Sequence, residues 1–520
     1  MFVLAASLTW LLTFIVGFFI LAPSTDDGYY IIASLGTAIK GSPGFWIGNE
    51  FAPSFFLPTA FTYVYGLLLK LTMVLGLDFG PFGFRVYQFL IILTLPLISF
   101  RALRSMFTND HSVRFLLLLT LLSLTYFLQS APIVRPEVLG AVLFTSFLGL
   151  RGKKIGRFDV SILILSLSGL MHPVYTLLAF AVFGISLIRR FRQTGLENPT
   201  YWINSLITFA TPFAVLAVYY AFNLNEYQAQ IGGRSTILTA NLFASPGFIL
   251  DNLRFWSDPD GIQYGLFSGY PAVAFVTTML GSTYLAFRNR SRLWGDDRLW
   301  VVLPMVLVQW LVFFLLPSWV PYLAFTSFVS SLVIVMAWQR PFGSIVDNRK
   351  QASLLALVLV GFSLVFITFH VGKFVLNSDV RLTPSGIHAV VSPILDDDNA
   401  QFYTNEARLI PPLIDNFADG DQIKIHFLYL DPDCLPPRLL ELANRNAETD
   451  IASLNPEKTY WGINLIDSKI DDQGTRSFVT KGAGSTVELD PTDVAYQDGK
   501  NLITRASSVR VTPASAGTCE

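Results

Sequence analysis

Charged side chains are scarce in this sequence. Asp, Glu, Lys and Arg make up 14% of its 520 residues, and 52% of the residues are hydrophobic. Soluble domains carry about 25% charged residues, so the low charge excludes an ordinary water-soluble protein and predicts an integral membrane protein.

An excess of basic over acidic residues is also lacking. The net charge of -1 leaves nothing to neutralise the phosphates of a nucleic acid, which excludes a nucleic-acid partner.

Cysteine is nearly absent, and its two occurrences lie in the C-terminal part of the sequence, after residue 375. Cys434 and Cys519 are disulfide candidates if this part of the chain faces an oxidising compartment. Internal repeats of about 20–50 residues are lacking too, so the sequence does not predict a repeat architecture.

Long apolar runs are confined to residues 1–374, whereas residues 375–520 are polar. The sequence therefore predicts a mainly α polytopic membrane domain over 1–374 and a small soluble α/β or α+β domain over 375–520. The first run, 2–22, lacks a preceding basic segment and is followed by Pro23, so we expect a retained first span and not a signal peptide. About eleven transmembrane helices are predicted, at 2–22, 83–101, 113–130, 137–151, 158–172, 174–189, 202–222, 268–287, 299–316, 321–338 and 352–373.

The stretch 56–77 decides the orientation, because counting it as a span reverses every later loop. If it lies along the outer membrane interface, 17 Lys and Arg residues share the cytosolic side, against about six in the opposite short loops. The positive-inside rule favours that arrangement. The first outer loop is then aromatic-rich and predicts interfacial helices. It also follows that the C-terminal domain faces away from the cytosol.

An acidic motif, Asp26-Asp27-Gly28-Tyr29-Tyr30, follows the first span directly. Charge held beside a bilayer is costly, which points to function. The alternative is a pair of solvated carboxylates that simply end a helix.

Further polar residues are predicted on the same outer face. Arg135 and Glu137 flank a proline in one turn, and their alternative role is an internal ion pair that caps the next helix. His172 precedes a proline in another turn, where it could instead be a packing residue at a helix break. The loop 223–267 carries further candidates, namely Arg234 and Arg254 for a lipid-borne phosphate and Trp256 for an acceptor. The alternative for the two arginines is that they snorkel to the membrane surface or pair with Asp251 and Asp258.

The long outer loop after the first span, opening with the acidic motif, resembles the GT-C superfamily of membrane glycosyltransferases. Protein mannosyltransferases, aminoarabinose transferases and arabinofuranosyltransferases are members, and they use polyprenyl-phosphate sugars on the extracytoplasmic face. The resemblance implies that Asp26 or Asp27 is catalytic. Arg85 sits where related chains often have an arginine, and the turn at 135–137 is similar to the polar turn beside the active site.

This resemblance implies a cell-envelope enzyme of the cytoplasmic (inner) membrane with its active site outside. The expected partners are a polyprenyl-phosphate-linked sugar, membrane lipids and a glycan, lipid or protein acceptor. An aspartate would act as general base on the acceptor hydroxyl, typically for a factor of about 10²–10⁴. Arg135, His172, Arg234 and Arg254 are candidates for binding the donor phosphate. Tyr29, Tyr30, Glu137 and Trp256 are candidates for binding or orienting the acceptor.

No cofactor is required by this chemistry. A divalent cation, Mg²⁺ or Mn²⁺, held by Asp26 or Asp27 together with the phosphate would also fit. Two other classes stay open. A lipid-linked glycan flippase or other transporter would place charge at the bilayer midplane, but the predicted spans hold little charge. An O-antigen-type polymerase or ligase would depend on arginines and histidines such as Arg234, Arg254 and His172.

Overall fold

The computed structural model of the chain describes the parts that surround the acidic motif, most of the predicted helices and the C-terminal strands. These described residues are 11, 15, 18–19, 25–47, 50–55, 57–78, 80–106, 134–151, 154–155, 158–195, 197, 199–225, 227–228, 270–315, 384–404, 407–419, 422–427, 459–465, 478–482, 485–497 and 501–511. The predicted spans 113–130, 321–338 and 352–373, and the predicted domain boundary at 374, lie outside them.

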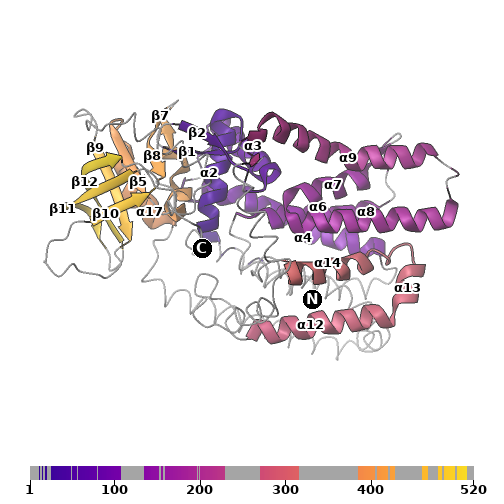
Figure 1. Cartoon of the computed structure of the whole chain (residues 1–520). Helices are drawn as coiled ribbons and strands as arrows, with labels where there is room; N and C mark the ends of the chain where they lie inside the picture. Colours follow the sequence, from indigo (N-terminus) through magenta and orange to yellow (C-terminus); the bar gives the residue numbers. More distant parts are fainter. Residues whose placement is uncertain are drawn as a thin grey trace.

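Apolar helices run side by side and form the larger part of the molecule (Figure 1). They coincide with predicted spans within a few residues, because each apolar run is bounded by Pro, Gly or charged residues. The bundle helices are α4 (Gly83–Met106), α6 (Pro136–Leu150), α7 (Val160–Met171), α8 (Pro173–Thr194), α9 (Pro199–Phe222), α12 (Tyr270–Arg288) and α14 (Val302–Leu315). Among the described residues, Gly80–Met106, α8 and α9 are long and apolar enough to cross a membrane.

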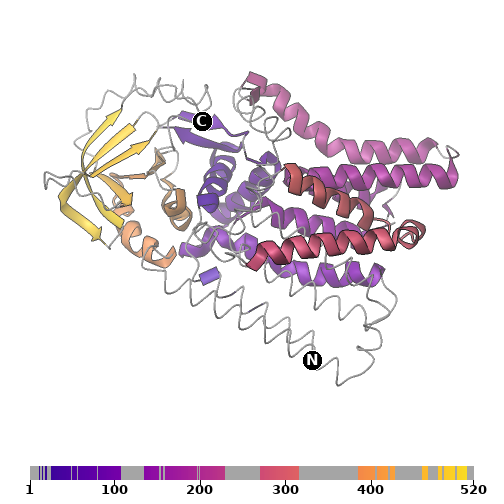
Figure 2. The ribbon, with the colours of Figure 1, turned by 60° about the horizontal axis from the view of Figure 1, so that its bottom comes forward.

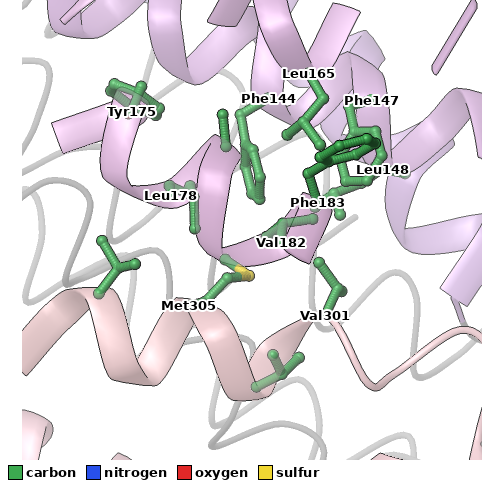
Figure 3. Packing of buried hydrophobic residues seen from close by; sticks show 14 of the residues in the cluster. Phe144, Phe147, Leu148, Leu165, Tyr175, Leu178, Val182, Phe183, Val301 and Met305 are labelled. Carbon is green, nitrogen blue, oxygen red and sulfur yellow. The ribbon is translucent and has the colours of Figure 1, made fainter. Parts of the chain in front are cut away.

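Interlocking aromatic and aliphatic side chains hold the bundle together. Phe144 of α6, Leu165 of α7, Phe183 of α8 and Met305 of α14 are buried in one cluster (Figure 3). The ring of Phe183 also stacks on Phe209 of α9, with centroids 4.0 Å apart. Such close packing is what associates helices in lipid, where hydrophobic burial between helices gives little driving force.

Other apolar side chains of the same helices point outward. On α9, Ile203, Val215 and Phe222 are 55%, 66% and 86% exposed. A water-soluble helix would pay a free-energy penalty for this surface, whereas a membrane helix presents it to lipid. The described helices therefore have the surface of a polytopic membrane protein.

The acidic motif begins helix α2 (Thr25–Lys40), which lies across one end of the bundle (Figure 1). A short hairpin follows, in which β1 (Gly44–Ile47) pairs with β2 (Glu50–Pro53). Helix α3 (Thr59–Leu75) then packs closely on α2, and Gly66 permits this, since a Cβ there would overlap the carbonyl oxygen of Ser34.

The other face of α3 is apolar and exposed, with Leu67, Leu71 and Val74 46%, 49% and 73% exposed. This helix occupies the stretch 56–77 on which the predicted orientation depends. An exposed apolar face opposite a packed one is what a helix at the membrane interface requires. Its position relative to a bilayer stays a prediction.

The basic ends of the helices lie at the opposite end of the bundle. Arg104 is in the last turn of α4, Arg151 caps the end of α6, and Arg192 is in the last turn of α8. Arg189 of α8 pairs with Asp297 next to the short helix α13 (Arg290–Gly295), which stands at the end away from α2 (Figure 1). The bundle is therefore polarised, with its basic end opposite the acidic motif.

Beyond α2, residues 384–511 supply a mixed six-stranded sheet in the order β10-β11-β12-β9-β5-β8, seen at the left in Figure 1 and Figure 2. Strands β8, β5 and β9 are parallel neighbours, while β9, β12, β11 and β10 pair antiparallel. Residues 411–416 form a 3-10 helix, η5. The elements are α17 (Pro384–Leu395), β5 (Ala400–Thr404), η4 (Ala407–Leu409), η5 (Pro411–Asn416), β6 (Ala418–Asp419), β7 (Gln422–Ile423), β8 (Ile425–Phe427), β9 (Thr459–Leu465), β10 (Phe478–Gly482), β11 (Ser485–Gln497) and β12 (Asn501–Val511).

A second buried cluster joins this C-terminal part to α2 and α3. Ile31 and Leu35 of α2 share it with Leu413 of η5, and the ring of Trp46 lies 5.4 Å from that of Phe417. Helix α2 is therefore packed between the end of the bundle and the sheet-bearing part, and the acidic motif lies at this junction.

Candidate active site

Asp27 is fully buried in the first turn of α2 and connects three segments that are far apart in the sequence. Its Oδ1 accepts a hydrogen bond from the backbone N–H of Val134, with 2.5 Å between N and O. Its Oδ2 lies 3.7 Å from Nη2 of Arg85, and both side chains have no exposed surface. A carboxylate also suits the first turn of a helix, where the unsatisfied N–H groups carry partial positive charge.

Arg85 extends this connection to the first span. Its Nη1 donates a hydrogen bond to the carbonyl oxygen of Phe18, with 3.1 Å between N and O. The neighbouring Phe84 ring lies 4.8 Å below the guanidinium carbon, a cation–π distance. Tyr65 of α3 donates to the carbonyl oxygen of Phe84 at 2.5 Å. The start of α4 is thus bonded to the first span, α2 and α3.

A second buried ion pair lies one residue beyond Val134. Arg135 donates to Glu137 through both Nε and Nη2, at 3.1 Å to Oε2 and 2.9 Å to Oε1. Both side chains are nearly fully buried. Pro136 occupies the first position of α6, where its missing N–H is not needed, so the arginine precedes the helix and the glutamate lies in its first turn.

His172 completes this group from the turn between α7 and α8. Its Nδ1 accepts a hydrogen bond from the N–H of Val174 at 3.3 Å and so caps α8. Its Nε2 lies 3.5 Å from Oε1 of Glu137. Because Nδ1 is an acceptor, the ring hydrogen is inferred to be on Nε2, facing the glutamate.

Burial lowers the pKa of His172 to about 4, although the nearby Glu137 carboxylate works in the opposite direction. The ring is therefore neutral at pH 7. It can offer an N–H donor to the glutamate or to a ligand, but no positive charge.

The two ion pairs are adjacent, because Asp27 binds Val134 and Arg135 follows directly in the chain. The end of the bundle next to α2 thus holds two carboxylates, two guanidiniums and a neutral imidazole. Buried charges of this kind are expensive unless they are paired, and those at the membrane surface mark functional sites.

The structure brings four of the predicted site residues together: Asp27, Arg135, Glu137 and His172. Asp26 lies in the same turn of α2, but its side chain is outside the described part. Tyr29 is partly buried, and Tyr30 packs edge-on against Phe61 of α3 at 5.5 Å. Among the other predicted residues, Arg234, Arg254, Trp256, Cys434 and Cys519 lie outside the described residues.

Two of the alternative roles considered above are visible as contacts. Arg135 and Glu137 do form an internal ion pair, and His172 does cap a helix. Arg85 and Gly28 were not among the predicted site residues. Arg85 was noted only as an arginine at a position where related chains often have one, and nothing in the sequence indicated that its partner would be Asp27.

A divalent cation finds no ready-made site in the described part of the chain, where His, Cys, Asp and Glu do not gather in groups of three or more that could hold a metal ion. Both oxygens of Asp27 already bind protein groups. A cation would therefore need Asp26, a donor phosphate or water as further ligands.

No protein-family profile matches this sequence, and the search of curated proteins finds no match. Among solved structures, the chain is similar to the crystal structure of ArnT from Cupriavidus metallidurans bound to undecaprenyl phosphate. The TM-score is 0.52, the sequence identity is 12%, and 97% of each chain is covered. The apo structure of the same protein gives a TM-score of 0.44 at 13% identity, again over 97% of each chain.

The chain has the ArnT fold. Because the similarity covers nearly all of both chains, it includes the helical bundle and the C-terminal part alike. ArnT is a GT-C glycosyltransferase, so the predicted resemblance to that superfamily is confirmed at the level of the fold. The outward-facing apolar side chains of the described helices agree with the predicted multi-pass membrane protein. At 12% identity, the roles of individual residues must be argued from this chain alone.

Proposed function

We propose that this protein is a GT-C-type glycosyltransferase that moves a sugar from a polyprenyl-phosphate donor to an acceptor hydroxyl outside the cytoplasmic membrane. The observation that carries the proposal is the buried acid–base cluster around Asp27, Arg135, Glu137 and His172. It lies in an ArnT-like fold, below the helix that follows the first span. The relative bound to undecaprenyl phosphate supports the class of donor.

The polarity of the bundle supports an extracytoplasmic site. Arg104, Arg151, Arg189 and Arg192 lie at the end of the helices away from Asp27. Lys and Arg are retained on the cytosolic side of membrane proteins, so the acidic end faces outward. A donor phosphate anchored by its lipid would sit at that outer surface, level with the ends of the helices.

The chemistry needs a base for the acceptor hydroxyl. In the proposed step a carboxylate removes the hydroxyl proton while the oxygen attacks the anomeric carbon, and the bond from that carbon to the phosphate breaks. The polyprenyl phosphate leaves with the electron pair. We assign the base to Asp26, because both oxygens of the adjacent Asp27 bind Arg85 and Val134. Asp27 then holds the turn in place and adds negative charge near an oxocarbenium-like centre.

The remaining residues divide between donor and acceptor. Arg135, Arg234 and Arg254 are proposed to meet the donor phosphate, with His172 as a neutral hydrogen-bond donor. Glu137 orients Arg135 and His172 through its two oxygens. Tyr29, Tyr30 and Trp256 are proposed to contact or position the acceptor. A divalent cation, if bound, would be held by Asp26 and would supply positive charge to stabilise the departing phosphate, and the step above does not depend on it.

The test replaces Asp26 and Asp27 singly by Asn and measures transfer in membranes supplied with labelled polyprenyl phosphosugars. Asp26→Asn should lower the rate by about 10²–10⁴-fold at normal expression. Asp78→Asn is the matched control, since this exposed aspartate lies in the same first outer loop and accepts a local hydrogen bond from the N–H of Gly80. Asp78→Asn should keep full activity.

Full activity in both Asp26→Asn and Asp27→Asn would refute the assignment. Loss of activity only after replacing Arg234 or Arg254 would instead favour a polymerase or ligase. Movement of a labelled lipid across the bilayer without any transfer product would favour the flippase.

A further inference from the structure

Gly28, the residue directly after the two aspartates, touches the C-terminal part of the chain. A Cβ atom placed on Gly28 would overlap the carbonyl oxygen of Ala407 in η4 and lie 2.5 Å from the Cβ of Ala407. Real Cβ atoms do not approach backbone this closely, so only glycine fits here without movement. Helix α2 and η4 therefore meet backbone to backbone, one residue from Asp27.

The contact is part of a continuous buried interface. Leu409 of η4 is 4% exposed, and Ile410 and Leu413 next to it have no exposed surface. All three share one apolar cluster with Tyr30 and Ile31 of α2. The C-terminal part is thus held against α2 by packed side chains as well as by the chain connection.

The first turn of α2 is consequently fixed from two sides. On the bundle side, Asp27 is bound by Arg85 and by the N–H of Val134. On the other side, Gly28 rests on Ala407. Interiors packed in this way are stiff, so an atom added at Gly28 must displace either η4 or the turn that carries the aspartates.

We propose that Gly28 is a positioning residue, and that the docked C-terminal part is thereby a component of the catalytic unit. The C-terminal part sets the place of the Asp26–Asp27 turn through the Gly28–Ala407 contact. The inference rests on the proposed function in one respect, namely that the two positioned aspartates take part in catalysis. The contact itself can be tested without any activity measurement.

The experiment uses the full-length protein in detergent, with Gly28→Ala compared with Gly184→Ala. Gly184 is a glycine of α8 whose Cβ position has no neighbour within 4 Å among the described residues, so its substitution adds the same atom without a clash with them. Hydrogen–deuterium exchange is followed over residues 407–417, and transfer is followed with a labelled polyprenyl phosphosugar. Gly28→Ala should speed exchange in 407–417 and lower kcat about 10–100-fold, with the donor KM within about twofold. Gly184→Ala should change neither.

Leu409→Ala tests the same interface by removing side-chain atoms from it. This variant replaces Gly28→Ala in the experiment if Gly28→Ala does not fold. It should likewise speed exchange in 407–417 and lower kcat. Unchanged exchange in both variants would overturn the docking contact, and faster exchange with unchanged kcat would overturn the positioning role. The proposed function fails by a different result, full activity of Asp26→Asn and Asp27→Asn, which leaves the exchange result of Gly28→Ala intact.

Discussion

Asp27 and Arg85 form a buried ion pair, with 3.7 Å between Oδ2 and Nη2, across the start of helices α2 and α4. Removing one partner of a buried pair leaves an uncompensated charge, which typically costs about 3–5 kcal/mol. Arg85→Gln should therefore lower the unfolding midpoint in detergent strongly. The double variant Asp27→Asn/Arg85→Gln should be more stable than the sum of the two single changes predicts. Additive losses would show that the two groups do not interact.

The pair of Arg135 and Glu137 depends on the fork of the guanidinium, which makes two hydrogen bonds at once. Arg135→Lys keeps the charge but loses this geometry, so it should destabilise the protein measurably. The control is Arg298→Lys, because Arg298 is 49% exposed and its contact with Asp296 spans 3.5 Å. An exposed pair contributes about 0–1 kcal/mol, and the control should change the unfolding midpoint little. Equal shifts for both variants would contradict the prediction.

Much of the bundle could be predicted, because apolar runs, and the Pro, Gly and charged residues that bound them, are local features of the sequence. The turn predicted at 171–173 is present: α7 ends at Met171 and α8 begins at Pro173. Helix α8 nevertheless continues to Thr194, beyond the predicted limit at 189. Arg190 and Arg192 ended the apolar pattern, but arginine is a good helix former.

The site could be predicted only as a set of outer polar residues. The sequence placed Asp27, Arg135, Glu137 and His172 on one face, since topology follows from charge. It gave no means of pairing Asp27 with Val134, 107 residues away, or Gly28 with Ala407 in the other part of the chain. Such contacts depend on tertiary packing, which a single sequence does not encode in a readable pattern.

The crossing of α2 and α3 makes a further prediction. A Cβ at Gly66 would overlap the carbonyl oxygen of Ser34 and the side chain of Thr37. Gly66→Ala should therefore push α3 from α2, with a loss of about 1–3 kcal/mol in the free energy of unfolding. Gly281→Ala in α12 is the control, since in the described part of the chain nothing lies within 4 Å of its Cβ position. A Gly66→Ala protein as stable as the control would show that the two helices are not in close contact.

The last prediction concerns pH and His172. Burial lowers the pKa of His172 to about 4 from its ordinary value of 6.5, so the folded protein keeps the ring neutral while the unfolded chain protonates it. Between about pH 6.5 and pH 4 the unfolded state binds more protons, and stability falls as the pH falls. The full shift corresponds to roughly 3 kcal/mol, which is present above pH 6.5 and is lost progressively below it.

Two variants isolate this contribution to the pH dependence. His172→Asn keeps an acceptor for the N–H of Val174 but does not titrate, whereas His172→Ala loses the helix cap as well, at a cost of about 1 kcal/mol. Unfolding midpoints measured from pH 7 to pH 4 should fall more steeply for the unchanged protein than for either variant. Because both variants lack the ring, their two curves should run parallel, with His172→Ala below His172→Asn. A wild-type curve parallel to these two would mean that His172 is not held neutral by burial, and its assignment as an uncharged donor beside Glu137 would fail.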